Sequence, residues 1–390
     1  MIEQDHIKEN LIDFSFPRLS GTEYEAKAFK IALEKMKALN FNPSTQEFNF
    51  STFYSRIYPK VALILTFSFL LLLYIDLSFI FTIVISSFIA VIFVFLFIYT
   101  RNPEKIRFGR ILHSQNLFVK LPKKKDEMND VKGNLFLFAH LDSKGQKLNI
   151  NMRILSFKSW LITLILFILL LIFREIIVSE LKLWLNLIAL LVLILNFIST
   201  FFILINVTNN QSNGAIDNAS GVACVMELLK YYSNPNSRLK NFDTYFVFTG
   251  AEETGTMGIR HFYNHIEGID KDKSIILNFD GIGSNVDAFS KDTKSPYFPK
   301  FYNVFLNKAQ KYDIKLNVSR FYIGVHSDGI FMMSRKNFMG IGFGDKNSYK
   351  FVHSVNDTID KVDPLILKQL CELLIEFLAE IDTQIQQKKK

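Results

Sequence analysis

Four long apolar runs without charged residues constrain the fold of this chain more than any other feature. A buried helix of a soluble protein keeps a polar stripe, whereas these runs are apolar on every face. A transmembrane helix needs about 20 apolar residues; the two longer runs reach that length, and Lys60 and Lys158 can extend the shorter ones by snorkelling. We therefore expect four transmembrane helices in two tight hairpins. The runs are residues 61–75, 77–100, 159–173 and 183–207.

Two hairpins place the three polar segments of the chain on the same side of the membrane. Arg56, Arg101 and Lys105 belong to a group of basic residues close to the membrane on this side. By the positive-inside rule, we expect the polar segments in the cytoplasm and the chain as a multi-pass integral membrane protein. The predicted organisation is one polar domain in segments 1–58, 101–153 and 208–390, interrupted by hairpins at 59–100 and 154–207.

The basic composition does not indicate a nucleic-acid-binding protein. The formal net charge is +8, but the lysines are scattered or terminal, and no aromatic-basic motif accompanies them. A basic surface beside an anionic membrane explains the charge more simply, so the expected partner is the lipid bilayer. The two cysteines, Cys224 and Cys371, also exclude a disulfide scaffold.

The polar segments alternate between short apolar stretches and amphipathic ones. This alternation is typical of an α/β fold with a central mixed, largely parallel sheet flanked by helices. Buried strands are predicted at residues 116–121, 134–139, 244–249 and 274–279. Helices are predicted at residues 26–39, 221–232, 255–266 and 364–385, the first of them after capping-box spacing from Ser20 to Glu23.

A histidine and an aspartate follow the strand predicted at 134–139. His140 and Asp142 are two residues apart, so extended chain would put both side chains on one side. His140 could bind a metal through one ring nitrogen while Asp142 orients the ring. Taken alone, an ordinary surface histidine is the simpler explanation. The position is nevertheless typical of a site, because ligands gather beyond the carboxyl ends of parallel strands.

Further acidic residues and a second histidine occupy comparable positions. Asp217 lies in a turn of small residues that enters a helix, where it could instead be a helix cap. Glu252 and Glu253 close a strand. They form either a solvated acidic turn or a pair in which one carboxylate binds a metal and the other acts as a base. Asp280 ends the next strand, and His353 lies near the end of the chain.

Together these residues point to a two-metal site. Imidazole and carboxylate ligands without thiolate suit Zn²⁺, with Mn²⁺ or Co²⁺ as alternatives. Two histidines and three carboxylates are too many for one tetrahedral zinc with an open position. They suit two metals about 3.5–4 Å apart that share a carboxylate. We therefore expect two zinc ions per chain.

The order of these residues resembles metallopeptidase family 28, the dizinc exopeptidases that include aminopeptidases and glutamate carboxypeptidases. The resemblance covers all three polar segments and extends to the stretch 16–21 and the pair Ser327 and Asp328. The residues that carry it are His140, Asp142, Asp217-Asn218-Ala219-Ser220-Gly221, Glu252, Glu253, Asp280 and His353.

The resemblance implies a role for each residue of the site. Glu252 would be the general base for peptide-bond hydrolysis by a metal-bridging water, and Asp142 would support His140 or its zinc. The bond between Asp217 and Asn218 would be cis. One zinc would be held by His140, Asp217 and Glu253, and the other by Asp217, Asp280 and His353, with Asp217 bridging.

Two features depart from the family pattern. The predicted membrane helices interrupt the domain that carries the site. In addition, Gly324 occupies the position at which aminopeptidases of this family often carry a tyrosine that stabilises the oxyanion. Tyr322 and His326 are the candidates to replace that tyrosine.

We therefore expect a membrane-anchored zinc exopeptidase, in the first place an aminopeptidase, that acts on peptide or protein termini. Asp217 follows the last apolar run by ten residues, at most about 36 Å of extended chain, which favours termini close to the membrane. The alternatives are a glutaminyl cyclase-like transferase and a catalytically inactive receptor or scaffold on the same fold. The complete ligand set and the intact pair of Glu252 and Glu253 favour hydrolysis.

Overall fold

The computed structural model describes residues 2–75, 78–124, 133–177, 179–291, 293–312, 314–318 and 326–387. Its contacts divide the chain into two compact units, each built from separate segments of the sequence. The sheet unit comprises Met1–Phe50, Leu112–Gly145 and Asn209–Lys390. The helical unit comprises Ser51–Ile111 and Gln146–Thr208.

The sheet unit is built on a mixed sheet with the strand order β1-β2-β6-β3-β7-β10-β8-β9. Strands β6, β3, β7 and β10 are parallel to one another, whereas β2 and β8 pair antiparallel with β6 and β10. The prediction of an α/β fold with a largely parallel sheet is confirmed. The strands are β1 (Ser44–Ser51), β2 (Ile111–Leu121), β3 (Gly133–His140), β6 (Phe242–Thr249), β7 (Ser274–Phe279), β8 (Asp287–Ser290), β9 (Lys315–Val318) and β10 (Met339–Gly344), and β4 (Gly145–Gln146) pairs separately with β5 (Thr208–Asn209).

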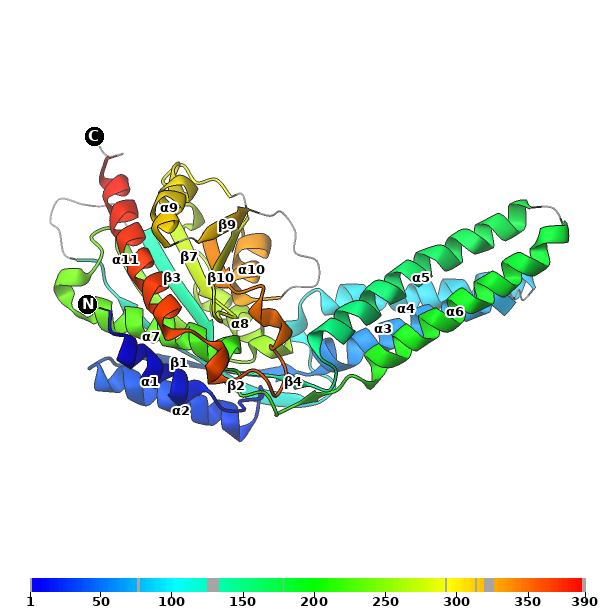
Figure 1. Ribbon diagram of the computed structural model, residues 1–390, viewed down its shortest axis with the longest axis horizontal. Helices are drawn as coiled ribbons and strands as arrows, with labels where there is room; N and C mark the ends of the chain where they lie inside the picture. The colour runs from blue at the N-terminus through cyan, green and yellow to red at the C-terminus, as the bar shows by residue number, and fades with distance from the viewer. Residues whose placement is uncertain are drawn as a thin grey trace. The chain divides into compact units, whose positions relative to one another are not determined.

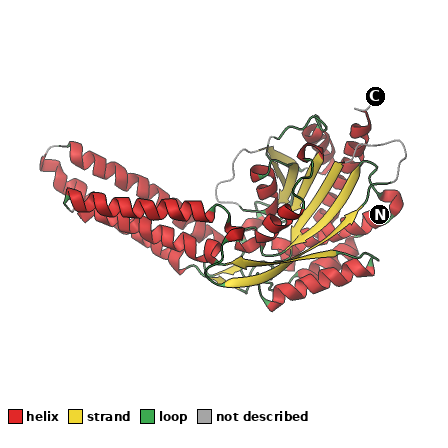
Figure 2. Cartoon of the chain, turned by 180° about the vertical axis from the view of Figure 1, so that it is seen from behind, coloured by secondary structure: helices red, strands yellow, loops and turns green. Residues whose placement is uncertain are grey.

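Helices cover both faces of this sheet (Figure 2). On β3, Leu135 and Leu137 contribute to the core on one face, whereas Phe136 and Phe138 contribute to the core on the other. A strand that is buried on both faces needs a continuous apolar sequence, which β3 has. The helices are α1 (Gln4–Phe14), α2 (Glu23–Ala38), α7 (Ser220–Ser233), α8 (Met257–His265), α9 (Phe301–Ala309), α10 (Asp328–Ile330) and α11 (Pro364–Gln387) (Figure 1).

The start of α2 differs from the predicted capping box. Thr22 is the N-cap and makes no side-chain capping bond. Ser20 instead donates its hydroxyl hydrogen bond to Asp142 Oδ2 at 2.5 Å, and Glu25 accepts one from the main-chain N–H of Gly21 at 2.6 Å. The buried carboxylate of Asp142 needs a hydrogen-bond donor. Ser20 provides it, and its side chain therefore does not cap the helix.

The helical unit contains four long helices, and all four are long and apolar enough to cross a membrane. α3 packs against α4, and α5 packs against α6, as expected for two hairpins. α3 also contacts α6, so the two hairpins join in one bundle. The helices are α3 (Tyr58–Ile75), α4 (Phe79–Thr100), α5 (Ile150–Ile176) and α6 (Lys182–Ile205).

Buried polar side chains connect α5 to α6 within the apolar bundle. Asn196 on α6 is fully buried and donates to Thr163 Oγ1 at 2.9 Å and to the main-chain oxygen of Trp160 at 3.0 Å. Near it, Ser199 donates to Ser159 Oγ at 2.8 Å. Lipid offers no hydrogen-bond partner, so polar groups at membrane depth stabilise the packing of helices when they pair with each other.

We predict that Asn196→Leu lowers the stability of the helical unit. The leucine removes both hydrogen bonds donated by Asn196, to Thr163 and to Trp160. The free energy of unfolding should fall by about 0.5–2 kcal/mol, the contribution of such bonds between membrane helices. Equilibrium unfolding in mixed micelles measures the change. Ser87→Leu, at an exposed position of α4, is the control and should leave the stability unchanged. Equal stabilities of all three proteins would contradict the prediction.

Candidate metal centre

The predicted ligands converge at the carboxyl ends of the parallel strands. His140 is the last residue of β3 and pairs in register with Thr249, the last residue of β6. Asp280 follows directly after β7, the other neighbour of β3. Glu253 lies beyond β6 in the 3₁₀ turn Glu252–Thr254. Because adjacent parallel strands end at one edge of a sheet, these side chains reach a common space.

Asp217 enters this space from the turn that precedes α7. The peptide bond between Asp217 and Asn218 is cis, as the family resemblance implies. Asn218 donates to the main-chain oxygen of Phe279 at 2.7 Å, and the turn is thereby fixed to the end of β7. At the start of the turn, a Cβ on Gly214 would lie 2.5 Å from Ser143 Cβ and 2.6 Å from the main-chain oxygen of Asp217, so only glycine fits there.

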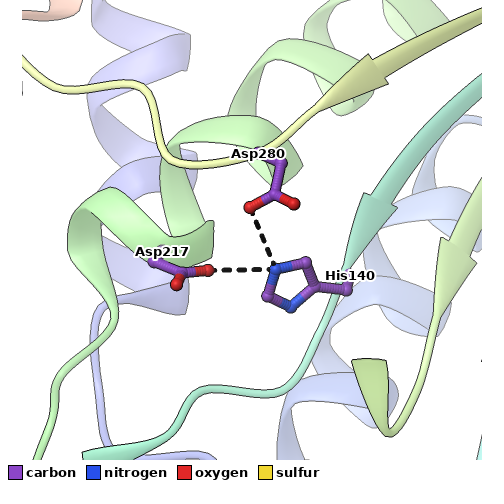
Figure 3. A group of neighbouring side chains, drawn as sticks. All are labelled: His140, Asp217 and Asp280. Atoms are coloured by element: carbon purple, nitrogen blue, oxygen red, sulfur yellow. Dashed lines mark ion pairs between the residues drawn. The ribbon is translucent and has the colours of Figure 1, made fainter. Parts of the chain in front are cut away.

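The two oxygens of the Asp217 carboxylate face two different histidines. Asp217 Oδ1 lies 3.0 Å from His140 Nε2, and Asp217 Oδ2 lies 3.2 Å from His353 Nε2. His140 Nε2 is also 3.5 Å from Asp280 Oδ1, and Figure 3 shows both aspartates turned toward this ring. His353 Nε2 is 2.8 Å from Glu253 Oε1. The structure thus contains two ligand groups that share Asp217.

The division of ligands between these groups differs from the expected one. Asp280, and not Glu253, joins His140 and Asp217, whereas Glu253 joins Asp217 and His353. The reason lies in the strand order: β7 is adjacent to β3, which brings Asp280 beside His140. Glu253 lies four residues beyond the end of β6, and the 3₁₀ turn carries it to His353.

The residues of both groups fit a divalent metal. Asp217 Oδ1 and Glu253 Oε1 are buried carboxylate oxygens that accept no hydrogen bond. A buried carboxylate oxygen without a donor is costly, and a cation would satisfy it. The ligand set consists of imidazole nitrogens and carboxylate oxygens, which suits zinc, manganese or cobalt.

Asp142 positions the ring of His140 and the pair of glutamates at the same time. Its main-chain oxygen lies 3.0 Å from His140 Nδ1, which leaves Nε2 directed toward Asp217. Its carboxylate accepts the main-chain N–H groups of Glu252 and Glu253, each at 3.0 Å. Asp142 therefore orients the ring of His140, as expected, and also binds the main chain of the turn that carries Glu252 and Glu253.

Two buried charged residues that the sequence analysis did not single out support the surrounding loops. Arg18 is fully buried and donates to the main-chain oxygens of Leu141 and Gly214, at 2.7 and 3.1 Å. Glu25 accepts from the main-chain N–H of Ala251 at 2.7 Å. Their partners are main-chain atoms far away in sequence, so no local pattern could have identified them. Arg18 lies in the stretch 16–21 that carries part of the family resemblance, which is the one available signal.

Comparisons with known proteins give a family match and similar folds. Residues 199–378 match the model of Peptidase family M28. The resemblance to this family is confirmed. Among curated protein sequences, none matches the chain significantly.

Solved structures of other proteins share the fold of nearly the whole chain. The aminopeptidase from Aneurinibacillus sp. strain AM-1 has a TM-score of 0.57 at 12% identity, over 97% of this chain and 94% of that one. A zinc aminopeptidase from Bacillus subtilis has a TM-score of 0.56 at 14% identity, over 97% and 95%. A glutaminyl cyclase from Fimbriiglobus ruber has a TM-score of 0.52 at 13% identity, over 99% and 96%. At these identities the structures establish the fold.

The two adjacent glutamates of the candidate metal centre have opposite electrostatic environments. Burial raises the pKa of Glu252 well above its ordinary value; the charge of His140 opposes this shift, and Asp280 and Glu253 add to it. Burial would also raise the pKa of Glu253, but the charges of His353 and Lys144 hold it below its ordinary value. Glu252 is therefore suited to carry a proton, and Glu253 to remain an ionised ligand.

The candidates for stabilising the oxyanion are only partly described. Tyr322 and Gly324 lie outside the described residues, and His326 belongs to neither ligand group. The neighbouring Asp328 is buried and accepts a hydrogen bond from the hydroxyl of Thr249 at the end of β6. Burial raises the pKa of Asp328 to about 7.

We predict that substitutions at the shared and unshared ligands change the zinc content differently. Asp217→Asn weakens both ligand groups and should lower zinc binding at each by more than the roughly tenfold that loss of an outer-shell partner of a ligand costs. His353→Ala should remove one zinc and retain the other. Equilibrium dialysis against a zinc concentration that fills both groups, followed by elemental analysis, measures zinc per chain, and His113→Ala, at an exposed histidine, is the control. Full zinc content in Asp217→Asn would contradict the shared-ligand arrangement.

Proposed function

We propose that this protein is a membrane-anchored, zinc-dependent exopeptidase, in the first place an aminopeptidase. The observation that carries the proposal is the carboxylate of Asp217, whose two oxygens face His140 and His353 at 3.0 and 3.2 Å. A carboxylate shared in this way is the arrangement required to hold two metals close together. The match to Peptidase family M28 supports peptide hydrolysis as the reaction.

The proposed ligands are His140, Asp217 and Asp280 for one zinc, and Asp217, Glu253 and His353 for the other. Two zinc ions at this position would polarise the carbonyl of the scissile peptide bond and lower the pKa of the attacking water.

Glu252 is the proposed general base. It is adjacent to the ligand Glu253, and its side chain is buried at the same strand end. We infer that it accepts a proton from the attacking water and donates it to the nitrogen that leaves when the carbon–nitrogen bond breaks. The burial that raises its pKa makes it a stronger base, and Asp142 fixes its main chain through the N–H of Glu252.

We predict that Glu252→Gln removes turnover and retains zinc. General acid–base catalysis contributes about 10²–10⁴-fold, so the rate on peptide substrates should fall by at least about a hundredfold. Glutamine preserves the shape of the side chain, and the neighbouring ligand Glu253 is unchanged. Rates of amino-acid release and zinc content of the same samples test this, with the exposed Glu23→Gln as control. A variant with normal turnover would refute the assigned role.

A glutaminyl cyclase-like transferase is the second candidate, because the Fimbriiglobus ruber glutaminyl cyclase shares this fold. The products separate the two reactions: an exopeptidase releases free amino acids from a peptide library, whereas a cyclase converts an N-terminal glutamine to pyroglutamate and releases ammonia. A chain that binds zinc and forms neither product would instead be a receptor or scaffold. We propose peptide or protein termini near the membrane as substrates, since α6 leads directly into the segment that carries Asp217.

We predict that the sheet unit lies in the cytoplasm of a multi-pass membrane protein. Four membrane crossings return the chain to its starting side, and the basic residues near the helices favour the cytoplasmic side. A tag fused to the C-terminus should therefore resist external protease in intact cells and be cleaved after the membrane is permeabilised. A tag inserted between α5 and α6 should be cleaved in intact cells. The reverse pattern would contradict the orientation.

A further inference from the structure

A half-buried lysine, Lys144, contacts one ligand of the Asp217–Glu253–His353 group. Lys144 Nζ lies 2.7 Å from Glu253 Oε2 and donates to the main-chain oxygen of the same residue at 3.3 Å. The side chain of Lys144 is 16% exposed, and that of Glu253 is 5% exposed. This ion pair is therefore largely shielded from water, and its charges interact strongly.

Hydrogen bonds of the preceding residue fix the main chain at Lys144, which therefore differs from a lysine on a free surface loop. The preceding residue, Ser143, donates its N–H to the main-chain oxygen of Arg18 at 2.9 Å. Its hydroxyl accepts the N–H of Arg18 at 3.0 Å and donates to the main-chain oxygen of Ser212 at 3.2 Å. Lys144 and Asp142 lie in the loop that directly follows His140, the last residue of β3, so the segment that positions this ligand also positions Lys144.

The two ligand groups differ in this respect. Within the part of the chain that the structure describes, the close ion pairs of His140 and Asp280 involve only histidine and aspartate. At the other group, the ammonium of Lys144 already neutralises Glu253. A dication that enters this group must share Glu253 with an ammonium or displace it, and either requirement weakens binding.

We propose that Lys144 makes the two metal groups unequal, so that the His140–Asp217–Asp280 group binds zinc tightly and the Asp217–Glu253–His353 group fills only at higher zinc concentration. This inference rests on the proposed metal centre.

The experiment is a zinc titration of the full-length protein in detergent, after removal of metal with a chelator and competed against a chromophoric zinc indicator. The wild type should bind in two phases whose dissociation constants differ by at least about tenfold, as expected for one opposing charge in a shielded site. Lys144→Met should tighten the weak phase by at least that factor and leave the tight phase unchanged. Lys144→Arg retains the charge and should retain the difference.

Three further variants complete the design. His353→Ala should abolish the weak phase and keep the tight one, whereas Asp280→Ala should abolish the tight phase. Lys120→Met is the matched control: Lys120 pairs with the buried carboxylate of Asp243 at 2.9 Å, away from the ligand groups, and its loss should change neither phase. The readout is zinc binding alone and needs no substrate.

Two outcomes would overturn the inference while the proposed function survives: equal affinities of the two groups in the wild type, or a weak phase that Lys144→Met and Lys144→Gln both leave unchanged. Failure of the wild type to bind zinc at either group would overturn the proposed metal centre itself. Circular dichroism of each variant verifies that it is folded, and the glutamine variant provides the test if the methionine variant does not fold.

Discussion

The sharing of one buried carboxylate between two histidines is the interaction on which the rest of the sheet unit depends. Asp217 is 7% exposed, and burial would raise the pKa of its carboxyl group. Its contacts with His140 and His353 reverse this effect and hold the pKa well below the ordinary range. An ionised carboxylate in a shielded position requires positive partners, and the fold supplies them from segments far apart in the sequence.

A set of main-chain hydrogen bonds keeps the surrounding acidic groups in place. Asp142 accepts the N–H groups of two consecutive residues, Glu25 accepts that of Ala251, and Asp357 accepts that of Ile216 at 2.6 Å. Through these N–H groups the three carboxylates hold the loops that carry Ala251, Ile216 and the two glutamates. Among the ligands, Asp217 Oδ1 and Glu253 Oε1 are buried and accept no hydrogen bond, which is the condition of a site prepared for a cation. Arg18 is a donor instead of an acceptor: its guanidinium donates hydrogen bonds to the main-chain oxygens of Leu141 and Gly214, which lie in two different loops.

The sequence was sufficient to predict which residues would lie together, but not how these ligands would be distributed between the two metal groups. The ends of buried strands are recognisable from their apolar runs, and parallel neighbours end at one edge, so the meeting of His140, Glu253 and Asp280 followed. The assignment of Glu253 to His353 depends on the path of a short 3₁₀ turn, which residue types do not specify. The role of Ser20 was predicted wrongly, because a helix cap is a local feature and its actual partner Asp142 is distant. Lys144 and Glu25 were missed for the same reason, because their partners Glu253 and Ala251 are distant in the sequence.

The strand order also determines when the site can form during synthesis. β3 carries His140, and both of its neighbours, β6 and β7, are encoded after the second pair of long helices. Until the ribosome has produced those later strands, β3 has no partner in the sheet, and His140 has no carboxylate from Asp217 or Asp280 beside it. A nascent chain that ends within either hairpin therefore lacks Asp217, Asp280 and the two strands that flank β3. The complete set of candidate ligands exists only in chains that already contain both pairs of long helices.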